Sequence, residues 1–449
     1  MNKTLKAAEW LFYLLIFILP IQTRWLYRPA TYKDEFWEYQ TRSLYGTEIL
    51  FLVILVLAII YFFQKFNLKN FIQRYRRKKL AVFSMAAAVL IALAIINITS
   101  NDNPGFSFYK AIQFIESLAL AGLIIFFLYN FKKFSWALIG SGLFQGILAI
   151  EQFLSQKVIA SKWLGMAGQD PQVLGTSVIE SGGQRILRAY GSLPHPNILA
   201  GFLVIVLLFI IYQFLEETNK KKKKFLLASF IFLFIALLVT FSRGAALALF
   251  ASLLFILIIG SSKKDFWNKH KSQINKIVIA TLLVIIGFSI VKSDLIFTRF
   301  QMQERLEVKS ITERISGYQD TWRIFKQHLF IGTGPGNYTT ALSKLHPDWQ
   351  VWQLQPVHNG FVLAMTEMGI ILTLLFSAIA FFIVKKMIKH LKGRWFNIEI
   401  IFSLSIIISL IIICFFDHFL WSLHFGNLLL AVSALTIKFV FDEKNNLLK

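Results

Sequence analysis

The chain has little of what soluble proteins depend on. Only 16% of its 449 residues are charged, against about 25% in an ordinary soluble protein. It has one cysteine, Cys414, so it cannot form an internal disulfide framework. Acidic residues number 24 against 47 Lys and Arg, and the net charge is +23. The scarcity of charge excludes a soluble globular protein, and the 56% apolar content excludes a disordered one.

The sequence instead contains long apolar segments, many of which are close in length to the ~20 residues that span a bilayer. We count twelve, which predict an all-α polytopic membrane protein with a single integral membrane domain over residues 1–449. The first segment begins like a signal peptide, but no small-residue cleavage site follows it, so we interpret it as a span. The segments cover residues 8–21, 46–63, 80–98, 111–129, 134–153, 197–215, 225–241, 244–260, 277–292, 359–384, 398–416 and 420–441.

The positive charge is distributed unevenly between the two faces that these spans define. Alternate connections hold 29 of the 47 Lys and Arg residues and carry a net charge of +22. The opposite face is left with +1. The positive-inside rule makes the first face cytoplasmic, with both termini on that side. The surplus therefore indicates orientation in a cytoplasmic membrane, and we expect the lipid bilayer as a partner and no nucleic acid.

The predicted outer face carries two long connections, residues 154–196 and 293–357. In the second, between the ninth and tenth spans, Ser310 to Glu313 form a capping-box pattern before a stripe of apolar residues at helical spacing. This predicts an amphipathic helix over about 311–330 that lies on the membrane surface or against the bundle. The glycines at 332, 334 and 336 follow a helix and lack a Lys-Ser/Thr ending, so we do not interpret them as a phosphate loop.

Arginine is concentrated on the predicted outer face. Ten of the 18 basic residues there are Arg, against four of 29 on the other face. Orientation does not require Arg over Lys, whereas bidentate recognition of phosphate does. The alternative is structural ion pairing with the acids on that side. Arg243 stands out, because the Ser242-Arg243-Gly244 break places it at the start of a spanning helix, where N–H groups favour an anion. A snorkelling Arg that ends a helix is the alternative for this position.

Two histidines precede predicted spans at their outer ends. His358 and Asn359 open the tenth span, and a histidine there could accept a proton from a hydroxyl. Glu367 lies half a turn out of phase with His358 and deeper, so we interpret it as a buried packing or pairing residue. His195 is a second candidate for the site, although a structural capping role explains this residue at least as well. Asn197 can also cap the sixth span. No His-Glu-x-x-His or paired-Cys spacing occurs, so we expect no metal and no cofactor.

Several of these stretches together resemble the O-antigen ligase and O-antigen polymerase superfamily of bacterial envelope glycan transferases. The matching residues are 188–197, 241–244, 314–322, 332–338 and 356–359, followed by Gly369. They occur in the expected order and on one predicted face, and the layout of about twelve spans with a large loop between helices 9 and 10 agrees along the chain.

The resemblance implies a GT-C-like, metal-independent enzyme without a cofactor. Its donor would be a glycan on undecaprenyl diphosphate, at the outer side of the inner membrane. Its acceptor would be a hydroxyl of lipid A-core or another envelope glycan or glycolipid. By motif, His358 would be the catalytic residue, and Arg188, Arg243 and Arg314 would bind the diphosphate. Supporting positions would be His195, Tyr318, Asn359 and Glu367.

Other functions stay open at this stage. A polymerase or a protein O-oligosaccharyltransferase would use the same donor with a different acceptor. A transporter or flippase of lipid-linked sugars would also need many spans and arginines for a diphosphate. It would not require polar motifs crowded at one face with the connections on the other face left as plain anchors.

Overall fold

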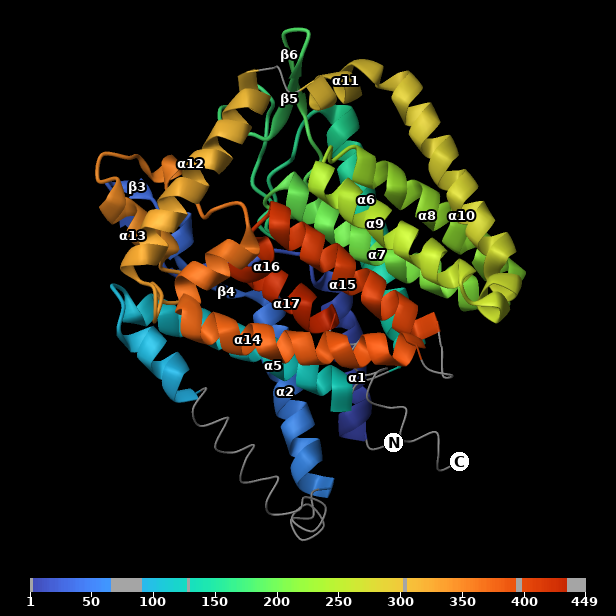
Figure 1. The fold of residues 1–449 in the computed structure, drawn as a ribbon, viewed down its shortest axis with the longest axis horizontal. Helices are drawn as coiled ribbons and strands as arrows, with labels where there is room; N and C mark the ends of the chain where they lie inside the picture. Colours follow the sequence, from blue (N-terminus) through green and yellow to red (C-terminus); the bar gives the residue numbers. More distant parts are fainter. Residues whose placement is uncertain (1–2, 66–90, 127–129, 302–304, 393–397, 434–449) are drawn as a thin grey trace.

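The computed structural model describes residues 3–65, 91–126, 130–301, 305–392 and 398–433, and over these residues the protein is mainly α-helical (Figure 1). The helices are α1 Lys3–Ile18, α2 Gly46–Lys65, α5 Pro104–Phe126, α6 Phe131–Ser155, α7 Pro196–Glu216, α8 Lys220–Leu238, α9 Arg243–Ser261, α10 Lys264–Val291, α11 Ser293–Gln301, α12 Arg305–Gln327, α13 Tyr338–Leu345, α14 Gly360–Lys392, α15 Ile398–Phe416, α16 Phe419–Ser422 and α17 His424–Ser433. Two short 3-10 helices are η1 Glu38–Gln40 and η2 Val351–Gln353.

Strands occur only in connections between helices of the described chain. β1 Arg24–Arg28 pairs antiparallel with β4 Arg42–Tyr45, and β2 Thr31–Tyr32 pairs with β3 Glu35–Phe36. In the 154–196 connection, β5 Val178–Ser181 and β6 Gln184–Leu187 form a hairpin that extends from the helices at the top of Figure 1.

Eight described helices are long and apolar enough to cross a membrane. They lie in α2, α5, α6, α7, α9, α10, α14 and α15. Helix α1 is 16 residues long, and α8 opens with five lysines, so neither reaches that standard although both follow predicted segments. The segments at 80–98 and 420–441 lie partly outside the described residues. The prediction of a multi-pass helical membrane protein is confirmed, while the count of twelve spans stays a prediction.

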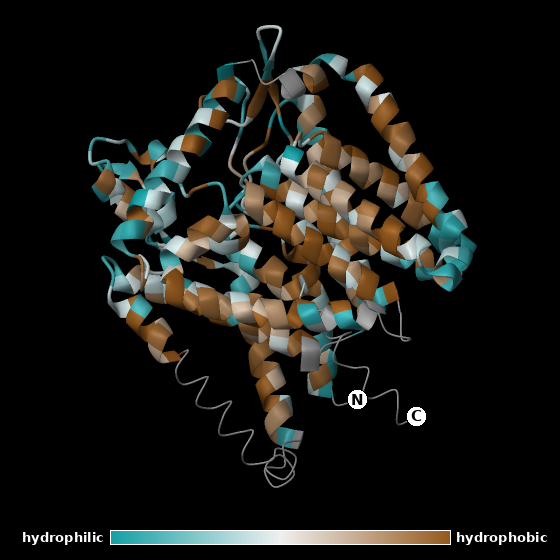
Figure 2. Ribbon diagram, in the orientation of Figure 1, coloured by the Kyte–Doolittle hydropathy of each residue, from teal (hydrophilic) through white to brown (hydrophobic). Residues whose placement is uncertain are grey.

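Helix α7 forms the centre of the bundle. It is apolar on every side, and all residues from 198 to 215 are buried, as expected for a helix that packs against neighbours all round. Helices α6, α8, α9 and α15 contact it. In Figure 2 the ribbons of the helix bundle are mostly hydrophobic in colour, whereas hydrophilic residues gather at the turn between α9 and α10 and around α12 and α13.

Helix α12 differs from its prediction at the start. It begins at Arg305, so Ser310 lies inside the helix, and the capping-box interpretation of Ser310 and Glu313 is wrong. The pattern failed because helical sequence continues upstream of Ser310. The amphipathic helix itself is present and packs against α13 and α14. Most side chains of the predicted apolar stripe are exposed, and only Phe325 among them is buried. The exposed ones are Ile311, Ile315, Tyr318, Trp322 and, beyond the helix, Leu329.

Two of the predicted spans are interrupted in the structure. The segment predicted at 420–441 is broken at Leu423, between α16 and α17. Helix α14 contains one non-helical residue, Gly369, with φ of 71°. Gly332 packs against this kink, where a side chain on either glycine would collide with backbone. The N–H groups of Thr333 and Gly334 donate to the backbone carbonyls of Thr366 and Glu367 in α14, both at 3.0 Å. The glycine-rich loop after α12 therefore docks onto α14.

Candidate functional site

A large cavity lies where several helix ends meet. Its volume is about 910 Å³, and it is lined by the starts of α7 and α9, by residues that precede α14 and by residues that follow α15. Residues of the 154–196 connection and of α12 complete its walls. The lining includes all four residues of the predicted core site, Arg188, Arg243, Arg314 and His358, together with the candidate His195. The fold thus brings together positions that are up to 170 residues apart in sequence.

Arg188 directly follows β6 and is buried, with its guanidinium bonded on three sides. Its Nε donates to the Thr240 carbonyl (2.7 Å), Nη1 to Ser177 Oγ (2.9 Å) and Nη2 to Asn197 Oδ1 (2.7 Å). These bonds join the hairpin connection, the turn between α8 and α9, and the start of α7. A guanidinium held in this way is a preorganised positive wall, because little reorganisation is needed when an anion arrives.

Arg243 is the first residue of α9, as the Ser-Arg-Gly break predicted. Phe241 has a φ of 50°, which is the left-handed conformation that turns the chain between α8 and α9. The Arg243 guanidinium forms an ion pair with the buried carboxylate of Glu307 on α12, at 3.1 Å. The pair ties α12 to the mouth of the bundle and fixes the guanidinium beside the N-terminal N–H groups of α9, where helix geometry favours an anion.

Arg314 projects from α12 into the same cavity. Its Nε is buried and has no hydrogen-bond partner among the described residues. A buried N–H without an acceptor is costly, so such a group is expected to find its acceptor in a ligand. Arg314 also lies close enough to His358 for its charge to lower the pKa of that imidazole.

His358 precedes α14 and is mostly buried in the cavity wall. Burial lowers the pKa of His358 below its ordinary value, and Arg314 adds to this effect, while the carboxylate of Asp417 opposes it. The imidazole is therefore neutral at neutral pH, the form that can accept a proton. Its Nδ1 is buried and unpartnered in the described part of the chain.

Asp417 is the functional candidate that sequence reasoning missed. It follows α15, lies buried in the cavity wall, and accepts bonds from the N–H groups of His418 (2.8 Å) and Phe419 (3.3 Å) and from Asn197 Nδ2 (3.1 Å). Burial alone would raise the pKa of Asp417, but the histidines around it and the bond from Asn197 outweigh that effect and hold it below the usual range. A signal was present, since Asp417 is the one acidic residue between Glu399 and Asp442.

Three titratable side chains meet at this point. One ligand atom each of His358, Asp417 and His418 lies within 4.8 Å of the other two. The His418 Nδ1 shares a hydrogen bond of 2.6 Å with Ser422 Oγ, and burial lowers the pKa of His418 to about 4. Asp417 and the Nδ1 of His418 are thus bonded to other protein groups, whereas the buried Nδ1 of His358 has no partner among the described residues. This arrangement suits a carboxylate that stabilises a protonated His358.

The start of α7 decides between the two caps that the sequence allowed. His195, not Asn197, is the N-cap, and its Nδ1 accepts from the Asn197 N–H at 3.2 Å. Burial lowers the pKa of His195, and the charge of Arg188 lowers it further. Asn197 instead bridges Arg188 and Asp417 with its two amide atoms. Pro196 occupies the first helical position, and the side chain of Asn197 already faces two charged partners, so Asn197 does not serve as the cap.

The remaining predicted residues lie around the site rather than in it. Asn359 caps α14 by accepting from the N–H groups of Phe361 and Val362 at 3.1 Å, and its Nδ2 donates to Tyr318 Oη at 3.2 Å. This bond holds α12 against the turn that carries His358. Glu367 lines a separate, mainly apolar cavity of about 190 Å³ and accepts from Trp421 Nε1 at 2.7 Å.

Comparison with known families gives one match. Residues 228–377 match the family described as O-Antigen ligase. The matched stretch runs from α8 into α14 and includes Arg243, Arg314 and His358, whereas Arg188 and Asp417 lie outside it. No curated protein sequence matches the chain. Residues 228–377 are thus similar to the O-antigen ligase family, and they lie on apolar helices that suit a membrane and around a cavity that collects the motif residues.

Proposed function

We propose that the protein transfers a glycan from an undecaprenyl-diphosphate carrier to a hydroxyl acceptor at the outer side of the cytoplasmic membrane. The observation that carries this proposal is the shared cavity of Arg188, Arg243, Arg314 and His358. Three guanidinium groups beside one neutral imidazole suit a reaction in which an anion leaves and a hydroxyl loses its proton. The similarity of residues 228–377 to the O-antigen ligase family supports the same substrate class.

The reaction needs no activated nucleotide, since diphosphate is already a competent leaving group. The acceptor oxygen forms a bond to the anomeric carbon, and the bond from that carbon to the diphosphate oxygen breaks. The electron pair of the broken bond stays on the diphosphate, where negative charge builds. Arg243 and Arg314 stabilise this charge, and the buried Arg188 adds a positive wall. Donors that the protein already holds in place contribute more than the same groups in solution, because they need little reorganisation when the charge develops.

The proton of the acceptor hydroxyl passes to His358. Its lowered pKa keeps the ring neutral and ready to accept. The carboxylate of Asp417 then stabilises the imidazolium, because the charges lie within one cluster of side chains. A positioned base of this kind typically contributes ~10²–10⁴ in rate. No step requires a metal.

The proposed face follows from the lysines. The Lys-rich starts of α8 and α10 lie one helix length away from Arg243, because α8 and α9 each span 19 residues between those lysines and the cavity. At 1.5 Å per residue this is about 28 Å, close to the hydrocarbon thickness of a bilayer. The positive-inside rule puts the lysines in the cytoplasm, and the cavity then opens on the outer side.

The direct test is transfer by the purified protein in lipid nanodiscs. A defined glycan on undecaprenyl diphosphate is supplied with lipid A-core, with a second lipid-linked glycan, or with an acceptor protein, and products are read by mass spectrometry. Transfer to lipid A-core identifies a ligase, and transfer to the other acceptors identifies a polymerase or a protein O-oligosaccharyltransferase. Absence of covalent transfer to all three, with movement of the donor across vesicles, would overturn the proposal in favour of a flippase.

A further inference from the structure

A second group of titratable side chains lies apart from the cavity of the proposed site. Glu48 is in the first turn of α2, Glu116 is in α5, and His424 is the first residue of α17. One ligand atom from each lies within 4.8 Å of the other two. All three are buried, with side-chain exposures of 6%, 7% and 3% of the residue maximum. None of them lines the 910 Å³ cavity.

The hydrogen bonds of this group are incomplete. Glu48 accepts from the Tyr45 N–H at 3.2 Å, and the carboxyl groups of Glu48 and Glu116 contact each other. Glu116 Oε2 and both ring nitrogens of His424 are buried without a hydrogen-bond partner among the described residues. No ion pair to either carboxyl occurs in the described chain. Two carboxyl groups in contact need something positive between them, because like charges that are buried together are strongly disfavoured.

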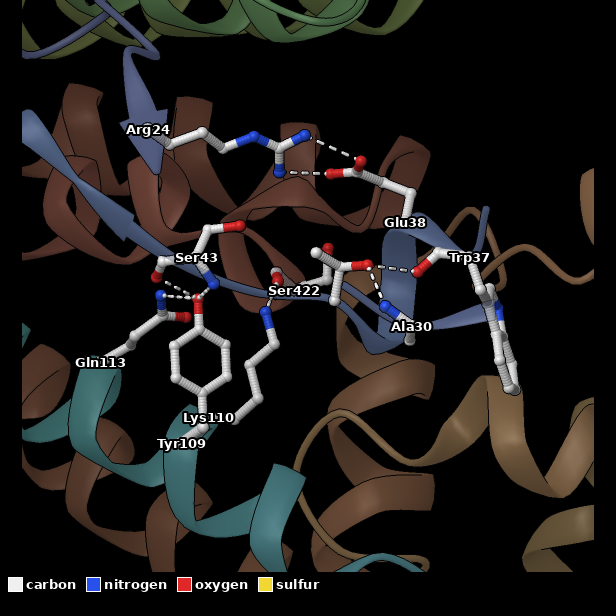
Figure 3. A network of polar contacts seen from close by, with 10 residues as sticks. Arg24, Ala30, Trp37, Glu38, Ser43, Tyr109, Lys110, Gln113 and Ser422 are labelled. Carbon is white, nitrogen blue, oxygen red and sulfur yellow. Dashed lines mark hydrogen bonds and ion pairs between the residues drawn. The ribbon is translucent and has the colours of Figure 1, made fainter. Parts of the chain in front are cut away.

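The surrounding contacts hold the three side chains in place. The Tyr45 ring stacks on the His424 ring, with centroids 5.0 Å apart. Figure 3 shows how α5 is fixed to β4: Tyr109 Oη accepts from the Ser43 N–H (3.1 Å) and donates to the Ser43 carbonyl (2.9 Å), and Gln113 Nε2 donates to Tyr109 Oη (2.8 Å). Gln113 precedes Glu116 by one helical turn, and its Oε1 is also buried without a partner in the described residues.

The nearest cation on α5 is already committed. Lys110 Nζ donates to the Ser422 carbonyl at 2.9 Å, as Figure 3 also shows, and this bond draws the ammonium toward α16. Its charge reaches both Glu367 and His424. The single ammonium of Lys110 does not neutralise the carboxyl groups of Glu48, Glu116 and Glu367 together. The group of Glu48, Glu116 and His424 can therefore accept a further cation.

We propose that Glu48, Glu116 and His424 bind a divalent metal ion of the first transition row. A proton shared by the two carboxyls would satisfy that pair but would leave His424 without a partner, whereas a metal ion uses all three. Two carboxylate oxygens and one imidazole nitrogen form a mixed set that suits Zn²⁺ better than Mg²⁺ or Ca²⁺. Ligand atoms of a tetrahedral Zn²⁺ lie ~3.4 Å apart, so small side-chain movements would complete the site.

The position of this site gives the ion a structural role. It would join α2, α5 and α17, three helices that are distant in sequence. Helix α17 begins two residues after Ser422, the end of α16, and α16 follows Asp417 and His418 directly. The ion would thus anchor the segment that carries Asp417 into the cavity without touching the reacting groups. The ligands come from separate helices, which is why no local spacing in the sequence announces them.

The first test is elemental analysis of the purified protein after dialysis against micromolar Zn²⁺ and then metal-free buffer. We expect about one Zn²⁺ per wild-type chain, as for a single three-ligand site. The metal content per chain of Glu116→Ala should be at least ~10-fold lower than that of the wild type, since one of three ligands is gone. His358→Ala is the matched control, because it removes a member of the other His and Asp group, and it should keep its metal. Metal lost in His358→Ala but kept in Glu116→Ala would overturn the assignment.

A second measurement uses the wild-type protein alone, in case Glu116→Ala does not fold. The protein is treated with a chelator, and its thermal unfolding midpoint is followed as Zn²⁺, Co²⁺ or Mg²⁺ is added. We expect Zn²⁺ and Co²⁺ to raise the midpoint and Mg²⁺ to leave it unchanged, with Co²⁺ absorption bands typical of nitrogen and oxygen ligands. No bound metal and no rise with any of the three ions would overturn the proposal and leave a proton shared by the carboxyls.

Discussion

Positive charge takes different forms at the two ends of the helix bundle. At the end where α8 and α10 begin, it is mostly lysine on exposed side chains, such as Lys132 and Lys269, which pair with Glu217 and Glu216 at 3.2 and 3.1 Å. In the lining of the cavity it is arginine, and Arg188 is buried and bonded on three sides. Exposed ion pairs contribute little, whereas a buried, bonded guanidinium needs little reorganisation to meet an anion. The form and burial of the charge, more than its amount, distinguish the proposed anion site from the lysines that we expect to set orientation.

The largest effect is expected when the proposed base at the cavity end is removed. His358→Ala should lower the rate of transfer by ~10³, within the range typical of general bases. The fold should persist, because His358 Nδ1 has no partner in the described structure. The measurement is single-turnover transfer in nanodiscs. His346→Ala is the control, since His346 lies 3.0 Å from Asp320 outside the cavity lining and should retain most of the activity. Full activity of His358→Ala would exclude it as the base.

The next test asks whether arginine matters as more than charge. Arg243→Lys keeps the charge and can still pair with Glu307 but loses the bidentate fork, so we expect a fall in transfer rate of ~10². Arg323→Lys is the matched control on α12, because the Arg323 side chain is 60% exposed and pairs with Asp320. Both rates are measured with the same donor and acceptor. Equal rates in the two variants would show that the cavity needs only positive charge at position 243.

The pH dependence tests the pairing of His358 with Asp417. His358 must be neutral to accept a proton, and its pKa lies below the ordinary value, so the rate should fall only below about pH 6.5. The Asp417 carboxylate raises the pKa of His358, so Asp417→Asn should move this acid limb to lower pH. The maximal rate should also drop at least ~10-fold, which corresponds to losing about 1.4 kcal/mol of stabilisation of the imidazolium. An acid limb that moves to higher pH would contradict this arrangement.

The comparison also explains how far the sequence could lead. Apolar length and the distribution of lysine predicted a multi-pass helical membrane protein, because both follow from the cost of burying charge in lipid. The site residues Arg243 and His358 could be selected because each stands at the start of an apolar helix. That they share one cavity with Arg188 and Arg314 required the structure, since helix order in a bundle is not encoded in hydropathy.

Two kinds of residue escaped sequence reasoning for physical reasons. Asp417 lies between two predicted spans, and only the packing of α7 beside α15 places Asn197 against it. Glu48, Glu116 and His424 lie on three helices whose contacts are long-range, so no spacing rule could join them. Capping patterns were weaker guides still. The sequence allowed either His195 or Asn197 to cap α7, and His195 does so because the tertiary partners of Asn197 outweigh the local preference for Asn.

The smallest expected effect comes from the lysine end. Lys221→Gln with Lys222→Gln removes two exposed charges from the start of α8, one helix length from the cavity. In protein already inserted and purified, charges at that distance are screened, with a Debye length of about 8 Å at physiological salt. Transfer should therefore stay within ~2-fold of the wild-type rate. A loss as large as that of Arg243→Lys would mean that the lysines act on the donor, and the separation between the two ends of the bundle would no longer hold.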